Sequence, residues 1–146
     1  MATSVQVVLD CADPGALARF WAAALHYEIQ PPPPGHDSWE SFLQAVGVPT
    51  EDWNAASAVV DPAGAGPRLY FQRVPEPKAG KNRLHLDLNV GGGHAARLAE
   101  RQQRVEAEVE RLTALGAREL SRHANERFDE SHVVLADPEG NEFCLQ

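Results

Sequence analysis

The chain has 146 residues, 43% hydrophobic and 23% charged, with a formal net charge of −8. This length favours one domain with a substantial core, and the acidic balance argues against a nucleic-acid partner because no basic patch is present. No apolar run approaches the about 20 residues that a membrane span needs, and no cation precedes Arg19, which argues against a secretory signal.

The first half of the chain predicts a strand, a helix and three further strands. Residues 5–11 alternate between two faces with the period of a strand. Asp13 followed by Pro14 is typical of a helix start, with an aspartate cap and a proline in the first turn. Apolar residues then recur at helical spacing. Further strands are predicted over residues 27–29, 57–61 and 68–74.

An additional helix is predicted within this first half, over residues 37–47. Trp39 and Phe42 belong to one apolar face of this helix. Asp37 and Glu40 resemble a capping box at its start. The segment interrupts the order of strands, so we interpret it as an insertion.

The second half of the chain repeats the same order of elements, with the boundary between the two modules near Gly80. A strand over residues 83–90 ends at three glycines, and a helix is predicted over about 94–115. Strands are then predicted over residues 117–122, 131–136 and 142–146. Residues 1–79 and 80–146 are thus two modules of a single predicted domain.

The duplication predicts the architecture. Val60-Asp61-Pro62-Ala63-Gly64 precedes the last strand of the first module, and Ala136-Asp137-Pro138-Glu139-Gly140 precedes the last strand of the second. We therefore predict an α+β fold of two βαβββ modules, which form a curved mixed sheet around one cavity with the helices outside.

The alternation within the strands selects the side chains that face this cavity. In residues 84–90 the leucines share the face expected to pack under the helix, whereas His85, Asp87 and Asn89 share the other. Unpaired polar groups are costly to bury, so the polar face should meet water or a ligand. The same alternation places these further residues on the cavity side: Gln6, Tyr70, Gln72, Glu142 and Cys144.

Several segments resemble the glyoxalase-like proteins of the vicinal oxygen chelate superfamily, which includes glyoxalase I, bleomycin-resistance proteins and extradiol dioxygenases. The segments are residues 6–13, 69–78, 83–88 and 134–145, and the likeness covers nearly the whole chain. The resemblance implies a divalent metal held by the first and last strands of each module, as in the enzymes of that superfamily. The positions that match those ligands are Gln6, Tyr70, His85 and Cys144.

This donor set departs from the superfamily pattern. Tyr70 and Cys144 stand where carboxylates would complete the metal site, so the resemblance implies a degenerate site. We predict either no cofactor or one divalent metal ion held by Gln6 and His85, with zinc favoured by imidazole and thiolate. The sequence is also compatible with structural roles for two of these residues. His85 is equally compatible with a cavity-lining residue bonded to Asp87, and Cys144 with a small buried hydrophobe.

Three functions are compatible with these residues. The first is a small-molecule-binding protein or enzyme that acts on a polar organic ligand, with His85 and Asp87 as catalytic residues. The predicted ligand-binding residues are Gln6, Trp39, Phe42, Tyr70, Gln72, Glu142 and Cys144. The second is a metal-dependent lyase, isomerase or dioxygenase, and the third is a sequestering protein of the bleomycin-resistance kind without turnover. We also expect a homodimer, and the two cysteines without CxxC spacing favour a cytoplasmic protein.

Overall fold

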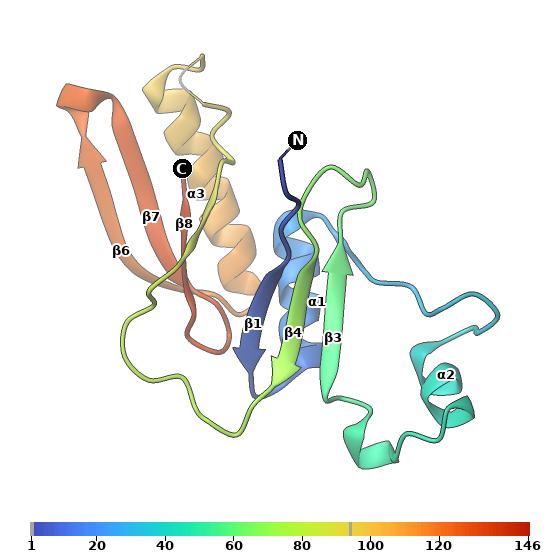
Figure 1. Cartoon of the computed structure of the whole chain (residues 1–146). Helices are drawn as coiled ribbons and strands as arrows, with labels where there is room; N and C mark the ends of the chain where they lie inside the picture. Colours follow the sequence, from blue (N-terminus) through green and yellow to red (C-terminus); the bar gives the residue numbers. More distant parts are fainter. Residues whose placement is uncertain (1, 94) are drawn as a thin grey trace. The chain divides into compact units, whose positions relative to one another are not determined.

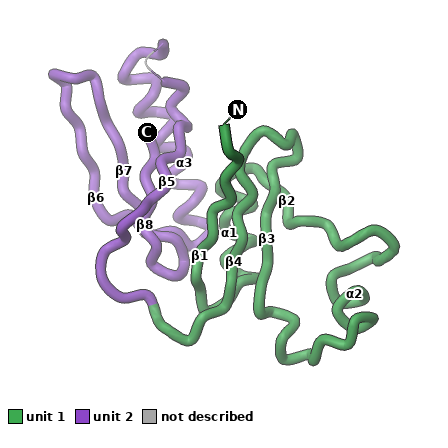
Figure 2. The backbone as a smooth tube through the Cα atoms, viewed as in Figure 1, with its two compact units in different colours: residues 1–77 green, residues 78–146 purple. Residues whose placement is uncertain are grey.

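The computed structural model describes residues 2–93 and 95–146 (Figure 1). The chain divides into two compact units, Met1–Pro77 and Lys78–Gln146 (Figure 2). This division falls close to Gly80, where the sequence places the boundary between the modules. Each unit has its own sheet and its own buried side chains.

Residues 2–77 of unit 1 contain four strands and two α-helices. In chain order they are β1 (Val7–Cys11), α1 (Pro14–Leu25), β2 (Glu28–Ile29), α2 (Trp39–Ala45), a short 3₁₀ helix η1 (Thr50–Asp52), β3 (Ala56–Val60) and β4 (Leu69–Arg73). The sheet order is β1-β4-β3-β2. β1 and β4 pair in parallel, whereas the other neighbours are antiparallel. The predicted strand–helix–strands order is therefore confirmed, with α2 and η1 inserted between β2 and β3.

Unit 2 repeats this topology. Its elements are β5 (Leu86–Leu88), α3 (Leu98–Ala114), β6 (Arg118–Asn125), a short 3₁₀ helix η2 (Glu126–Phe128), β7 (Glu130–Ala136) and β8 (Glu142–Leu145). The sheet order is β5-β8-β7-β6, again with the first and last strands parallel. The α+β class is thus confirmed, and the eight strands of the described residues form two open mixed sheets, one in each unit.

The N-terminus of α1 is capped by two side chains. Asp13 Oδ1 accepts a hydrogen bond from the backbone N–H of Ala16 at 3.0 Å, as the sequence predicts. Asn54 adds a second link, because its Oδ1 accepts from Gly15 N at 2.8 Å and its Nδ2 donates to Asp13 Oδ1 at 2.8 Å. The loop before β3 is therefore tied to the first turn of α1, and α1 packs on β3 and β4.

The core of unit 1 lies between α1 and the sheet. Trp21 and Leu17 from α1 are buried against Leu69 and Phe71 of β4, and all four are almost fully inaccessible to solvent. Strand alternation predicts that Leu69 and Phe71 pack under the helix, and this is confirmed. Alternation from residue 5 also predicts that Val5 packs, but Val5 precedes β1, which begins at residue 7, and is 72% exposed.

The cap of α2 differs from the predicted one by a single residue. Ser38, not Asp37, is the N-cap: its Oγ accepts from Ser41 N at 3.0 Å, and Ser41 Oγ accepts from Ser38 N at 3.3 Å. Glu40 therefore lies one position before Ser41, which is the second residue of the capping box. No residue of α2 is buried, and Val46 at its end is 57% exposed.

The core of unit 2 is formed by α3 and three strands. Val105, Val109 and Leu112 of α3 pack over the sheet that carries Leu135 and Phe143, and all five are buried. The helix is shorter than predicted. Its expected start at residue 94 lies outside the described residues, and the assigned helix begins at residue 98. No helix in the described ranges is both long enough and apolar enough to cross a lipid bilayer.

Candidate functional site

The polar side of β5 meets β8 in unit 2. The register pairs Asp87 with Cys144, so both side chains point to the sheet face opposite to that of Leu86 and Phe143. His85 directly precedes β5, and because it is two residues before Asp87 it lies on the same face as Asp87. One donor atom from each of His85, Asp87 and Cys144 lies within 4.8 Å of the others. The structure therefore brings together three of the residues that the sequence selects.

The members of this triad interact directly with one another. His85 Nε2 lies 3.3 Å from Asp87 Oδ1, and both side chains are about half exposed. Burial raises the pKa of the Cys144 thiol to about 11, with the charge of Asp87 and a hydrogen bond to it as further causes. The thiol is consequently protonated at neutral pH and is a donor to the carboxylate, not a thiolate nucleophile.

Glu142 belongs to the same strand but has a different partner. It forms an ion pair with Lys81, and its backbone N–H donates to Asn82 Oδ1 at 3.2 Å. The hydrogen bond from Lys81 holds the pKa of Glu142 below its ordinary value. Glu142 is therefore an ionised carboxylate bound to its own cation, and it stands outside the three-residue group around Cys144.

In unit 1 the predicted residues Gln6 and Tyr70 are connected by Arg68. Gln6 Oε1 accepts from Arg68 Nη1 at 2.6 Å, and Arg68 Cζ lies 5.1 Å from the centre of the Tyr70 ring. Gln72 is separate from this network, because its Nε2 donates to Asp10 Oδ1 at 2.7 Å. The amide oxygen that would make Gln6 a metal ligand is thus engaged by a guanidinium.

The aromatic residues of α2 reach the same network through Gln30. Trp39 Nε1 donates to the backbone oxygen of Gln30 at 2.6 Å, and the side-chain oxygen of Gln30 accepts from Arg68 Nε at 2.6 Å. Trp39 and Phe42 stack edge to face with their ring centres 5.8 Å apart. Arg68 and Gln30 are not among the site residues predicted from the sequence. The available signal was the alternation of β4, which places Arg68 on the same face as Tyr70.

The predicted residues therefore form two groups, one in each unit. His85, Asp87 and Cys144 converge in unit 2, whereas Gln6 and Tyr70 contact Arg68 in unit 1. The pairing of Gln6 with His85 at one metal ion joins residues of different units and stays a prediction.

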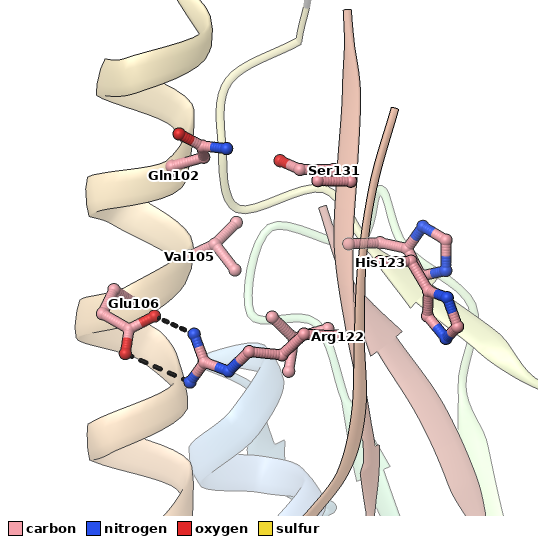
Figure 3. Close-up of a pocket in the computed structure, with 9 residues that line it drawn as sticks. Gln102, Val105, Glu106, Arg122, His123 and Ser131 are labelled. Atoms are coloured by element: carbon pink, nitrogen blue, oxygen red, sulfur yellow. Dashed lines mark hydrogen bonds and ion pairs between the residues drawn. The ribbon is translucent and has the colours of Figure 1, made fainter. Parts of the chain in front are cut away.

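A separate hollow of about 370 Å³ opens between α3 and the β6–β7 strands (Figure 3). Gln102 and Val105 of α3 and Ser131 of β7 line it. At one end, Glu106 accepts hydrogen bonds from Arg122 at 2.6 and 3.1 Å. The charges in this hollow compensate each other, and none of the predicted site residues lines it. It therefore adds nothing to the triad.

Comparison with known proteins identifies related folds. A family model described as Glyoxalase-like domain matches residues 6–146. A glyoxalase/bleomycin resistance/dioxygenase family enzyme from Burkholderia phytofirmans PsJN superposes with a TM-score of 0.60 at 14% identity, covering 96% of this chain and 94% of that one. A possible glyoxalase from Bacillus cereus gives 0.60 at 14% identity, with 100% and 99% coverage.

A third structure contains ligands. FosX from Listeria monocytogenes, a fosfomycin resistance protein solved as a mutant with Mn(II) and 1S,2S-dihydroxypropylphosphonic acid, gives a TM-score of 0.61 at 13% identity, covering 100% of this chain and 90% of that one. At such identities the likeness to these structures extends to the fold alone. No curated protein sequence matches the chain significantly.

Proposed function

Because the chain belongs to the glyoxalase-like domain family, we propose that it binds or processes a polar organic ligand without the complete metal site of the wider superfamily. This proposal is carried by the contacts of the residues that stand at the metal-ligand positions of the superfamily. Gln6 is engaged by Arg68, Tyr70 lies against the same guanidinium, and Cys144 is a protonated thiol. These groups are poor ligands for a hard divalent ion, yet they line polar strand faces.

His85 and Asp87 supply the chemistry in this proposal. The carboxylate of Asp87 orients the imidazole through Nε2, and the thiol of Cys144 in turn hydrogen-bonds Asp87. The other ring nitrogen of His85, Nδ1, is then available to take a proton from a ligand or to donate one. The arrangement suits proton transfer in an isomerase or lyase reaction, and it also suits binding without turnover.

A ligand screen followed by two histidine substitutions tests the proposal. Calorimetry first identifies polar organic compounds that raise the melting temperature of the wild-type protein, and the same shift is then measured in each variant. We expect His85→Ala to lose most of this shift and His123→Ala to keep it, because His123 is a β6 residue of the same unit outside the triad. Equal shifts in both variants would exclude His85 from the ligand site.

One observation favours a metal-dependent alternative. An imidazole, a carboxylate and a thiol lie within 4.8 Å of one another in unit 2, which is close enough to hold one ion. This donor set fits zinc better than the Mn(II) found in the FosX structure, because manganese prefers oxygen ligands. Cys144 would release its proton on binding. A bound zinc ion supplies Lewis-acid polarisation of a ligand oxygen.

Elemental analysis of untagged protein purified without chelator separates the two candidates. Near-stoichiometric metal that is lost in His85→Ala supports the metal-dependent alternative. No metal, even after incubation with zinc, nickel, iron and manganese, supports the first proposal. Gln6→Ala distinguishes two kinds of metal site, because it loses metal only if Gln6 joins His85 at one ion.

A further inference from the structure

The guanidinium of Arg68, at the residue before β4, is held by uncharged groups. Its Nε donates to Gln30 Oε1 and its Nη1 to Gln6 Oε1, both at 2.6 Å. The Tyr70 ring lies against it, with 5.1 Å between the ring centre and Cζ. Three contacts from three different segments of unit 1 therefore fix the position and plane of this cation.

None of these contacts neutralises the positive charge. Arg68 is half-buried, and within the described residues no carboxylate forms an ion pair with it. Five other arginines of the described chain are paired with carboxylates, whereas Arg104, like Arg68, donates to an uncharged acceptor. The paired ones are Arg73, Arg97, Arg101, Arg111 and Arg122. Removing a cation from water without a counter-ion is unfavourable, so an anion that joined Arg68 would gain more than it would at a paired arginine.

Arg68 also keeps donors for such an anion. Its Nη2 has no acceptor in the part of the chain that the structure describes. A carboxylate or phosphoryl group accepts two parallel N–H bonds from the fork of a guanidinium. Gln6 and Gln30 must present their oxygens to Arg68, because an amide NH₂ cannot accept from it. Each amide therefore retains its NH₂ group as a further donor.

We propose that Arg68 is the centre of an oxyanion-binding site in unit 1, and that its ligand is an organic carboxylate or phosphoryl compound with an apolar portion. Trp39 donates to the backbone oxygen of Gln30, and the side chain of Gln30 contacts Arg68. The rings of Trp39 and Phe42 therefore offer an aromatic surface that is separated from the cation by Gln30 alone. This site goes beyond the proposed function, because none of the residues that contact Arg68 belongs to the group of His85, Asp87 and Cys144 in unit 2.

Nuclear magnetic resonance titration at constant ionic strength tests the site with three probes. Benzoate carries a carboxylate, phenyl phosphate a phosphoryl group, and benzyl alcohol no charge. We expect saturable shifts of the Arg68 Nε–H and Trp39 Nε1–H signals with at least one anion and none with the alcohol. Arg68→Gln should weaken anion binding about tenfold or more, because it removes charge-assisted hydrogen bonds.

Two further variants make the result specific. Arg73→Gln removes a β4 arginine that is already paired with Asp52, so anion affinity should not change. Gln6→Glu keeps Arg68 but places a carboxylate against its Nη1, and it should abolish binding even if Arg68→Gln fails to fold. Tighter binding of benzoate would assign a carboxylate ligand, and tighter binding of phenyl phosphate a phosphoryl one.

The proposal is overturned if neither anion binds the wild-type protein, or if Gln6→Glu binds both anions as well as wild type does. These readouts involve neither turnover nor metal. Their failure would therefore leave the tests of His85 untouched, and failure of the His85 tests would leave this site standing.

Discussion

At the scale of single residues, Cys144 shows how burial, together with a charged neighbour, keeps a thiol protonated. Its thiol is buried and hydrogen-bonded to Asp87, and its pKa is raised from 9.0 to about 11. A raised pKa means that the protonated thiol is the form favoured by folding. This contribution to stability is complete below pH 9.0 and is lost as the pH rises towards 11.

We predict that Cys144 reacts slowly with iodoacetamide at pH 8, where only about one thiol in a thousand is ionised. Asp87→Asn should accelerate the reaction, because it removes the anionic neighbour that opposes ionisation. Mass spectrometry of chelator-treated protein in a Cys11→Ser background measures the rate. Asp10→Asn, in unit 1, is the control and should leave the rate unchanged; an equal acceleration there would contradict the assigned cause.

The sequence identifies some of these residues but not others. His85 and Asp87 can be selected because strand alternation places them on one face. Alternation also places Arg68 on the face of Tyr70, but it does not show which residues contact the guanidinium. Its partners Gln6 and Gln30 lie 62 and 38 residues away along the chain, and only strand pairing and loop geometry bring them to the guanidinium.

At the scale of elements, the two helix starts of unit 1 show where local sequence is sufficient. Asp13 before Pro14 fixes the start of α1 without ambiguity. Before α2, Asp37 and Ser38 are both suitable caps and stand next to each other, so the sequence does not determine which one is used. The reciprocal bonds between Ser38 and Ser41 decide it in the structure.

Asp13→Ala should lower the free energy of unfolding by about 1 kcal/mol at pH 7, because it removes a cap from α1. The N–H of Ala16 and the amide of Asn54 hold the pKa of Asp13 below its ordinary 3.8. The stabilisation is therefore present above pH 3.8 and is lost as the pH falls through the lowered value. Urea unfolding followed by circular dichroism at several pH values measures both effects.

Asp37→Ala is the matched control for this prediction. Asp37 also precedes a helix, but Ser38 is the cap there, so its removal should change stability by less than about 0.5 kcal/mol. A loss as large as that of Asp13→Ala would mean that the capping assignment is wrong.

At the scale of the whole molecule, the repeated turn is the clearest link between sequence and topology. Asp61 accepts from the backbone N–H groups of Ala63 and Gly66, and Asp137 accepts from those of Glu139 and Asn141. In each unit this turn leads towards the strand that pairs in parallel with the first. The duplicated motif therefore predicts the duplicated topology. Where α3 and β5 begin is harder to predict, because the loops that shorten them have no regular pattern.

All three tryptophans lie in unit 1: Trp21 in α1, Trp39 in α2 and Trp53 directly after η1. Both tyrosines are there too. Unit 2 is therefore silent in intrinsic fluorescence, although it contributes to circular dichroism. Phe143→Ala empties a fully buried position of unit 2 and should cost about 3–5 kcal/mol. If the chain unfolds as one domain, tryptophan emission and circular dichroism shift to lower urea together. A shift in circular dichroism alone would reveal two independently folding halves, only one of which emits light.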